Sequence, residues 1–172
     1  MPEYITRRAL IGAALATISG GAFAQPREAW KTYFNSRYGT SIAYPSRFKP
    51  GRPPDADDGL SFTADDGAKL AVWGSFNALE HDVAGLEAFL REDPKEGEKV
   101  TYRAAGRNWL VLSGTRGDRL FYKRYVLSHR NEVVNAFEIS YPASLASSYG
   151  PIATRLSKSL HAGPGYQVKG AP

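Results

Sequence analysis

Side chains that could do chemistry are most concentrated in residues 55–67, DADDGLSFTADDG, which hold five aspartates in thirteen positions. Such a run could bind calcium, supply a carboxylate pair for acid–base catalysis, or form turns. A calcium loop needs alternating oxygen ligands, a glycine at the sixth position and a glutamate at the twelfth. Here Gly59 comes one position early, and the next glutamate along the chain is Glu80. A weak calcium loop is kept as an alternative. Its ligands would be Asp55, Asp57 and Asp58.

The second half of the run, Asp65-Asp66-Gly67, fits a hairpin turn, because aspartate and glycine tolerate the positive φ that such turns need. A catalytic carboxylate pair also needs apolar surroundings that raise one pKa above the other. The neighbouring residues are small or polar. We therefore interpret the whole run as turn residues in a solvated loop.

No other pattern specifies a reaction. The three histidines lack the spacing of a zinc-binding pair, and no serine lies in a Gly-x-Ser-x-Gly elbow. We expect no metal, no cofactor and no catalytic residues. The alternative is a hydrolase whose site is assembled from scattered residues such as Ser113, Asp118 and His129. A deep pocket where these three side chains converge would favour it.

Basic residues dominate the segment 99–130, where eight lysines and arginines accompany a single acid, Asp118. Tyrosine and tryptophan are interleaved with them, and arginine together with aromatic residues is typical of binding hot spots. We predict a protein or envelope partner with an acidic surface. The predicted contact residues are Arg103, Trp109, Lys123 and Arg124. The structural alternative places the aromatics in the core and the charges at turns and strand edges.

The first 24 residues predict export. A charged start with Arg7 and Arg8 precedes a mildly apolar stretch that ends in small residues, which is the layout of a secretory signal. We expect cleavage between Ala24 and Gln25. Residues 6–11, TRRALI, also match the twin-arginine pattern, so both export routes stay open. With no cysteine and no second apolar segment, we predict a soluble periplasmic protein without a stable membrane anchor, which rarely meets nucleic acid.

After the signal we expect one domain over residues 25–162 and a flexible tail over 163–172. Alternating apolar and polar residues predict strands, two of which flank the Asp-Asp-Gly-Ala turn as a hairpin. The expected strands are residues 40–44, 60–64, 69–75, 100–104, 109–113, 120–128 and 133–141. Helical periodicity predicts a helix over 82–93, two helical segments meeting near Pro151, and a further amphipathic turn or two over 27–37.

The strand at 120–127 is apolar on both faces. Leu120, Tyr122 and Val126 point one way, and Phe121, Tyr125 and Leu127 point the other. A sheet that is wet on one side alternates cleanly, so we predict that helices cover both faces. The expected fold class is α/β (α+β), an α/β/α sandwich around an antiparallel sheet. Lys123 and Arg124, being adjacent, must point to opposite faces, so at least one lies near apolar surroundings or lines a cleft.

Residues 37–45, RYGTSIAYP, resemble a recurrent strand of exported bacterial proteins of unknown function and, more loosely, of the PsbP-like superfamily. That strand reads Tyr-Gly-aromatic-Ser and then Tyr-Pro, and Thr40 stands at the aromatic position. The other matching positions are Asp58-Gly59 before Phe62, residues 70–75 with Asn77, Asn108-Trp109 with Leu112-Ser113-Gly114, Tyr122-Lys123, Phe137 with Tyr141-Pro142, and Pro151-Ile152. Together they cover residues 37–160.

The resemblance implies an α/β/α sandwich with an antiparallel sheet, and it implies an accessory or binding factor that stabilises a larger assembly. It supplies no catalytic residues. We therefore expect a periplasmic, non-enzymatic binding or accessory protein. The alternative is a small-ligand-binding protein, or the hydrolase described above.

Overall fold

The structure is a computed structural model and describes residues 28–92 and 94–162. The predicted cleavage site at Ala24 and Gln25 and the predicted tail over 163–172 lie outside these residues. Within the described ranges, no helix is long and apolar enough to cross a membrane.

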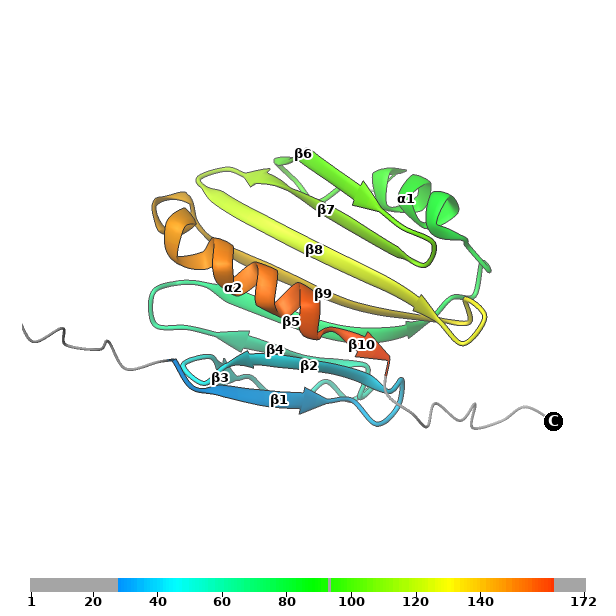
Figure 1. The fold of residues 1–172 in the computed structure, drawn as a ribbon, viewed down its shortest axis with the longest axis horizontal. Coiled ribbons are helices and arrows are strands. Elements are labelled where there is room, and N and C mark those ends of the chain that lie inside the picture. Colours follow the sequence, from blue (N-terminus) through cyan, green and yellow to red (C-terminus); the bar gives the residue numbers. More distant parts are fainter. Residues whose placement is uncertain (1–27, 93, 163–172) are drawn as a thin grey trace, which may run out of the picture.

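Strands are the commonest elements of the described chain and form two antiparallel sheets (Figure 1). The larger sheet has seven strands in the order β3-β4-β5-β9-β8-β7-β6 and the smaller has three in the order β1-β2-β10. The strands of the larger sheet are β3 (Lys49–Pro50), β4 (Gly59–Thr63), β5 (Lys69–Phe76), β6 (Glu98–Ala105), β7 (Trp109–Arg116), β8 (Arg119–Ser128) and β9 (Val133–Pro142). Those of the smaller sheet are β1 (Trp30–Phe34), β2 (Thr40–Pro45) and β10 (His161–Ala162).

Helix is a minor part of the described chain. It consists of α1 (Val83–Glu92), a 3-10 turn η1 (Ala143–Leu145) and α2 (Ala146–Ser159). In Figure 1, α2 crosses in front of β8 and β9, while α1 lies beside β6 and β7. The structure has one continuous α2 with Pro151 inside it, instead of two segments meeting at the proline. The core holds α2 together, because Tyr149, Ile152 and Leu156 on its inner face are all buried.

The predicted α/β/α sandwich is wrong, and the fold is β-rich. One face of the larger sheet is covered by α2 together with the smaller sheet. On the other face, α1 packs through Leu86 over parts of β7, β8 and β9, and Trp73 of β5 and Ala105 of β6 pack against the same cluster. The prediction failed because apolar residues on both faces of a strand require a cover, and a second sheet provides that cover as well as a helix does. The helical turn predicted within residues 27–37 is likewise wrong, since β1 pairs there with β2.

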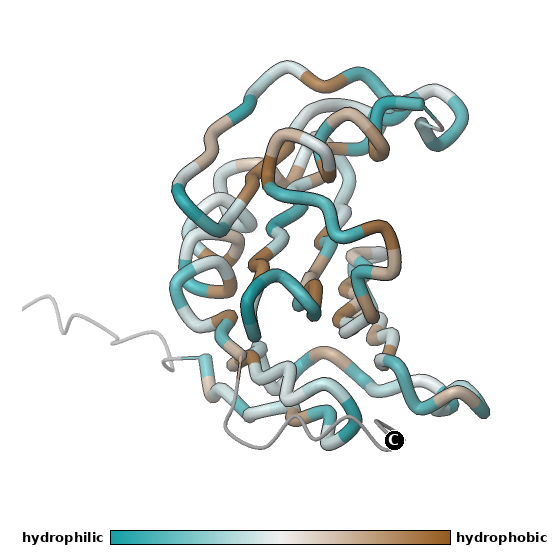
Figure 2. The backbone as a smooth tube through the Cα atoms, turned by 90° about the vertical axis from the view of Figure 1, so that its right-hand side faces the viewer, coloured by the Kyte–Doolittle hydropathy of each residue, from teal (hydrophilic) through white to brown (hydrophobic). Residues whose placement is uncertain are grey.

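Alternate side chains of β8 point to opposite faces of the larger sheet, as the sequence predicts. Leu120, Tyr122 and Val126 pack against the main core beneath α2, whereas Tyr125 and Leu127 belong to a second cluster beneath α1. Figure 2 views the molecule at 90° to Figure 1, and brown hydrophobic stretches are interspersed with teal hydrophilic ones along the tube. The larger sheet therefore separates two apolar layers of different size.

Gly74 of β5 lies in close contact with Tyr38 and with Thr40 of the smaller sheet. A Cβ at this position would lie 2.3 Å from the Cβ of Tyr38 and 2.7 Å from Thr40 Oγ1. The same Thr40 hydroxyl donates a hydrogen bond of 2.8 Å to Asn135 Oδ1 on β9, and both residues are fully buried. The two sheets can therefore pack this closely only because residue 74 is a glycine.

Candidate functional site

A hollow of about 450 Å³ lies between α1 and the face of the larger sheet formed by β5, β8 and β9; we call it the α1 hollow. Its walls are mainly apolar and include Trp73, Leu86, Tyr125 and Val134. Hollows of this size with apolar walls and a few polar groups are typical of binding sites for small molecules. We take it as the candidate functional site.

Strand register explains the floor of the α1 hollow. Trp73 on β5 pairs with Ala136 on β9, and Ala136 pairs in turn with Tyr125 on β8. The two large rings therefore stand on either side of an alanine and meet edge to face, 6.0 Å between centroids. Ala136 itself is fully buried, so the side chains of Trp73 and Tyr125 form the floor at this point, and Leu86 of α1 also lines the space.

Local capping and one ion-pair network hold α1 over the sheet. The amide of Gly85 donates to Asp82 Oδ1 at 2.8 Å, which caps the start of the helix. Glu87 accepts hydrogen bonds from Arg103 on β6 and from Arg91 one turn later in α1. The hydrogen bond from Arg103 is the main cause that lowers the pKa of Glu87. Arg103, predicted as a partner contact, thus ties α1 to β6.

The mouth of the α1 hollow carries large apolar side chains that face solvent. Phe76 is 54% exposed, Leu79 is 65% exposed and Phe89 is 49% exposed, and all three line the hollow. Single exposed apolar residues are common on soluble proteins, but a contiguous group around a hollow is typical of an interaction site.

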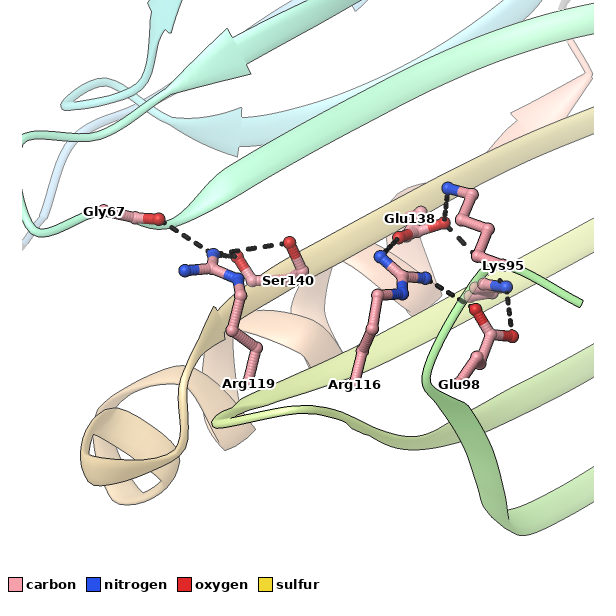
Figure 3. A network of polar contacts seen from close by, with 8 residues as sticks. Gly67, Lys95, Glu98, Arg116, Arg119, Glu138 and Ser140 are labelled. Carbon is pink, nitrogen blue, oxygen red and sulfur yellow. Dashed lines mark hydrogen bonds and ion pairs between the residues drawn. The ribbon is translucent and has the colours of Figure 1, made fainter.

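Four charged residues, Lys95, Glu98, Lys123 and Glu138, line the end of the α1 hollow away from Phe76. Arg116 joins them in one network of ion pairs, which we call the ion cluster; Figure 3 shows part of it. At its centre, Lys123 on β8 and Glu138 on β9 are cross-strand partners and both are 7% exposed.

Each of the two acids in the ion cluster forms ion pairs with at least two of the three bases. Lys123 Nζ lies 2.5 Å from Glu98 Oε1 and 4.0 Å from Glu138 Oε2. Arg116 donates to Glu98 at 2.6 Å and to Glu138 at 2.9 Å, and Lys95 donates to Glu138 at 2.7 Å. Burial raises the pKa of Glu138, but hydrogen bonds from Lys95 and Arg116 and the charge of Lys123 outweigh it, so this pKa is lowered. Glu138 is therefore ionised at neutral pH.

Tyr125 stands between the apolar walls and the ion cluster. Burial, together with the negative charges of Glu138 and Glu98, raises the pKa of its hydroxyl. The phenol therefore stays protonated at neutral pH and adds no further negative charge to the hollow.

The four residues predicted to contact a partner lie on opposite faces of the larger sheet. Arg103 and Lys123 are on the α1 side, in ion pairs with Glu87 and Glu98. Trp109 and Arg124 are on the α2 side, with the Arg124 guanidinium 5.1 Å from the Trp109 ring. Arg124 also donates to Ser157 Oγ of α2 at 3.0 Å.

Sequence reasoning missed the acids that neutralise the basic segment. Glu87, Glu98 and Glu138 all lie outside residues 99–130, so a count within that segment could not find them. One signal was present: Glu138 is the only charged residue in the apolar strand 133–141, and a charge inside a buried strand needs a partner.

The residues of the hydrolase alternative do not converge. Asp118 lies in the turn before β8 and His129 in the turn after it, so the ten residues of β8 separate them. At a rise of about 3.3 Å per residue, that is a distance of roughly 30 Å. Ser113 lies within β7, paired with Tyr122.

The aspartates of residues 55–67 occupy turns. Asp65, Asp66 and Gly67 form the predicted hairpin between β4 and β5, with Thr63 opposite Lys69 and a φ of +85° at Gly67. Asp55, Asp57 and Asp58 lie in the exposed loop before β4. Among the described residues, no three His, Cys, Asp or Glu side chains are grouped so that they could hold a metal ion.

Asp66 has a structural partner that the sequence did not indicate. The hydroxyl of Tyr149 on α2 donates a hydrogen bond of 2.6 Å to Asp66 Oδ2. Burial raises the pKa of Asp66, but the hydrogen bonds from Tyr149 and from the Ala68 amide outweigh it, and the pKa is lowered. The hairpin between β4 and β5 is thus fastened to α2.

Replacing Tyr149 by phenylalanine is expected to lower the free energy of unfolding at pH 7 by about 1–2 kcal/mol, because a hydrogen bond to a charged acceptor is lost. Asp66 has a lowered folded pKa, so its contribution is present above the unfolded pKa of about 3.9 and is lost as the pH falls through the folded value. Urea unfolding at pH 7 and at pH 2.5 measures this. A deficit of Tyr149→Phe that is as large at pH 2.5 as at pH 7 would contradict it.

Solved structures resemble this fold. The chain matches the solution structure of cyanobacterial PsbP (CyanoP) from Synechocystis sp. PCC 6803 with a TM-score of 0.60 and 14% identity, over 86% of this chain and 98% of that one. It also matches the Ran-binding protein Mog1p of Saccharomyces cerevisiae with a TM-score of 0.57 and 11% identity, over 78% and 96%. No protein-family model and no curated protein sequence matches the chain significantly. The chain therefore has the fold that PsbP and Mog1 share, as the resemblance in its sequence indicates.

Proposed function

We propose that this chain is an exported, non-enzymatic binding or accessory protein of the periplasm, and that it binds its partner in the α1 hollow. One observation carries the binding role: three large apolar side chains, Phe76, Leu79 and Phe89, remain exposed around a hollow that ends in buried charges. Exposed apolar side chains around a hollow are favourable for the folded protein only when something covers them.

Two further considerations support the proposal. The export signal predicted over residues 1–24 supports the location. The similar structure of Mog1p is that of a Ran-binding protein, so at least one protein with this fold is a binding protein. That support is analogy, because a fold hosts many functions.

Photo-crosslinking in cells tests the proposal. The photoreactive amino acid p-benzoylphenylalanine is placed at Phe89, at the mouth of the α1 hollow, and in a second strain at Phe34 on β1. Phe34 is 53% exposed, close to the 49% of Phe89, but it lies on the smaller sheet. We expect a discrete adduct, seen as one added mass or one shifted band, from position 89 and none from position 34. Equal adducts from both positions, or no adduct from position 89, would overturn the proposed site.

A further inference from the structure

We infer that the α1 hollow binds a small amphipathic acid, meaning a molecule with one carboxylate or sulfonate at the end of an apolar body. This inference rests on the proposed function and specifies the ligand of the same site. The apolar body matches the walls of the hollow, and the anionic group matches the ion cluster at its end.

The walls favour a compact apolar body. Trp73 and Tyr125 provide two aromatic faces, and Leu86 and Val134 close the space between the helix and the sheet. Phe89 and Leu79 stand at the mouth with about half or more of their surface exposed. An apolar chain that lies between these groups removes its own surface and theirs from water, which stabilises the complex by roughly 25 cal/mol for each Å² buried.

The net charge of the ion cluster favours an anionic ligand group. The ion cluster contains three bases, Lys95, Arg116 and Lys123, against two acids, Glu98 and Glu138, so one positive charge is left without a counter-charge. A cationic ligand would be repelled, and a neutral one would leave this charge as it is. An anionic group completes the charge balance in a partly desolvated place, where electrostatic attraction is stronger than in water.

Lys95 is the base best placed to receive the anion. Its side chain is 60% exposed, whereas Lys123 is buried and bonded to Glu98. Lys95 Nζ donates to Glu138 Oε2, and an ammonium group has three N–H donors, which leaves two of them for a ligand. Lys95 also lines the α1 hollow itself.

Three eight-carbon probes with an anionic, a neutral and a cationic head group test the inference on the full chain. They are octanoate, 1-octanol and octylammonium, and isothermal titration calorimetry measures their binding. We expect octanoate to bind at least tenfold more tightly than octylammonium and more tightly than 1-octanol. Fluorescence locates the site: octanoate should change the emission of the wild-type chain but not that of Trp73→Phe. Equal affinity for octanoate and octylammonium would overturn the inference.

Lys95→Gln has a matched control in Lys49→Gln. Lys49 also pairs with a carboxylate at 2.7 Å, that of Asp65, and its side chain is 67% exposed, but it lies on β3 away from the α1 hollow. We expect Lys95→Gln to weaken octanoate binding about five- to tenfold and to leave 1-octanol binding unchanged. Lys49→Gln should change neither. An unchanged octanoate affinity in Lys95→Gln would overturn the role of the ion cluster.

Phe89→Ser and Phe34→Ser separate this inference from the proposed function. Phe89→Ser should weaken octanoate and 1-octanol by a similar factor, and Phe34→Ser should weaken neither. If no probe binds but the crosslink at position 89 still forms a protein adduct, the small-acid inference fails while the proposed function stands. If the crosslink also fails, both fail. Circular dichroism melting confirms that each variant is folded.

Discussion

Lys123→Met is expected to lower the free energy of unfolding at pH 7 by about 3 kcal/mol. Its Nζ lies 2.5 Å from Glu98 Oε1 and 4.0 Å from Glu138 Oε2, with all three side chains less than a tenth exposed. Removing one partner of a buried ion pair costs about 3–5 kcal/mol, and here Glu98 would lose its closest counter-charge. The lower end is expected because Arg116 still bonds to both acids. Urea unfolding followed by circular dichroism measures the change.

The pH dependence of this variant has a definite sign. The pKa of Glu138 is lowered in the folded state, in part by the charge of Lys123. A carboxylate whose pKa is lowered on folding stabilises the protein at pH values above its unfolded pKa of about 4.3. This stabilisation is lost as the pH falls through the folded pKa. The deficit of Lys123→Met should therefore be largest near neutral pH and become smaller below about pH 4.

Lys49→Met is the matched control for Lys123→Met. Lys49 also forms a close ion pair, 2.7 Å from Asp65, but both side chains are more than half exposed. Exposed pairs contribute about 0–1 kcal/mol, so this variant should lose less than about 1 kcal/mol. Equal losses in the two variants would contradict the burial of Lys123 and of its partners Glu98 and Glu138.

Gly74→Ala is expected to destabilise the protein by about 3 kcal/mol, the upper end of the usual range for inserting a methyl group into a packed core. The new Cβ would lie 2.3 Å from Tyr38 Cβ and 2.7 Å from Thr40 Oγ1. Both atoms are close to the backbone and cannot swing away, so the smaller sheet must move off β5. The buried hydrogen bond from Thr40 to Asn135 would be strained at the same time. Thermal and urea unfolding measure the loss.

Gly150→Ala is the control for Gly74→Ala. Gly150 lies in α2, and a Cβ there would meet nothing within 4 Å. The gain in helix propensity is offset by the restriction that Pro151 places on the preceding residue, so a change of no more than about 0.5 kcal/mol is expected. A Gly74→Ala variant as stable as the wild type would contradict the close contact of Gly74 with Tyr38 and Thr40.

Local patterns in the sequence predicted much of the secondary structure. Alternation located six of the seven strands of the larger sheet and missed the short β3, the Asp-Gly turn located the hairpin between β4 and β5, and helical spacing located α1 with its cap at Asp82. Each of these signals depends on residues close together in the chain. The sequence also predicted that alternate side chains of β8 point to opposite faces, and Lys123 and Arg124 do so.

The sequence alone did not determine what covers the sheet or what pairs with the basic segment. Apolar strand faces require burial, but a second sheet covers them as well as a helix does. The basic residues looked unpaired because Glu87, Glu98 and Glu138 come from other segments and meet them only in three dimensions. Composition and local periodicity thus determined the elements. Long-range contacts decided the layers, the ion cluster and the α1 hollow, because those contacts join residues far apart in the chain.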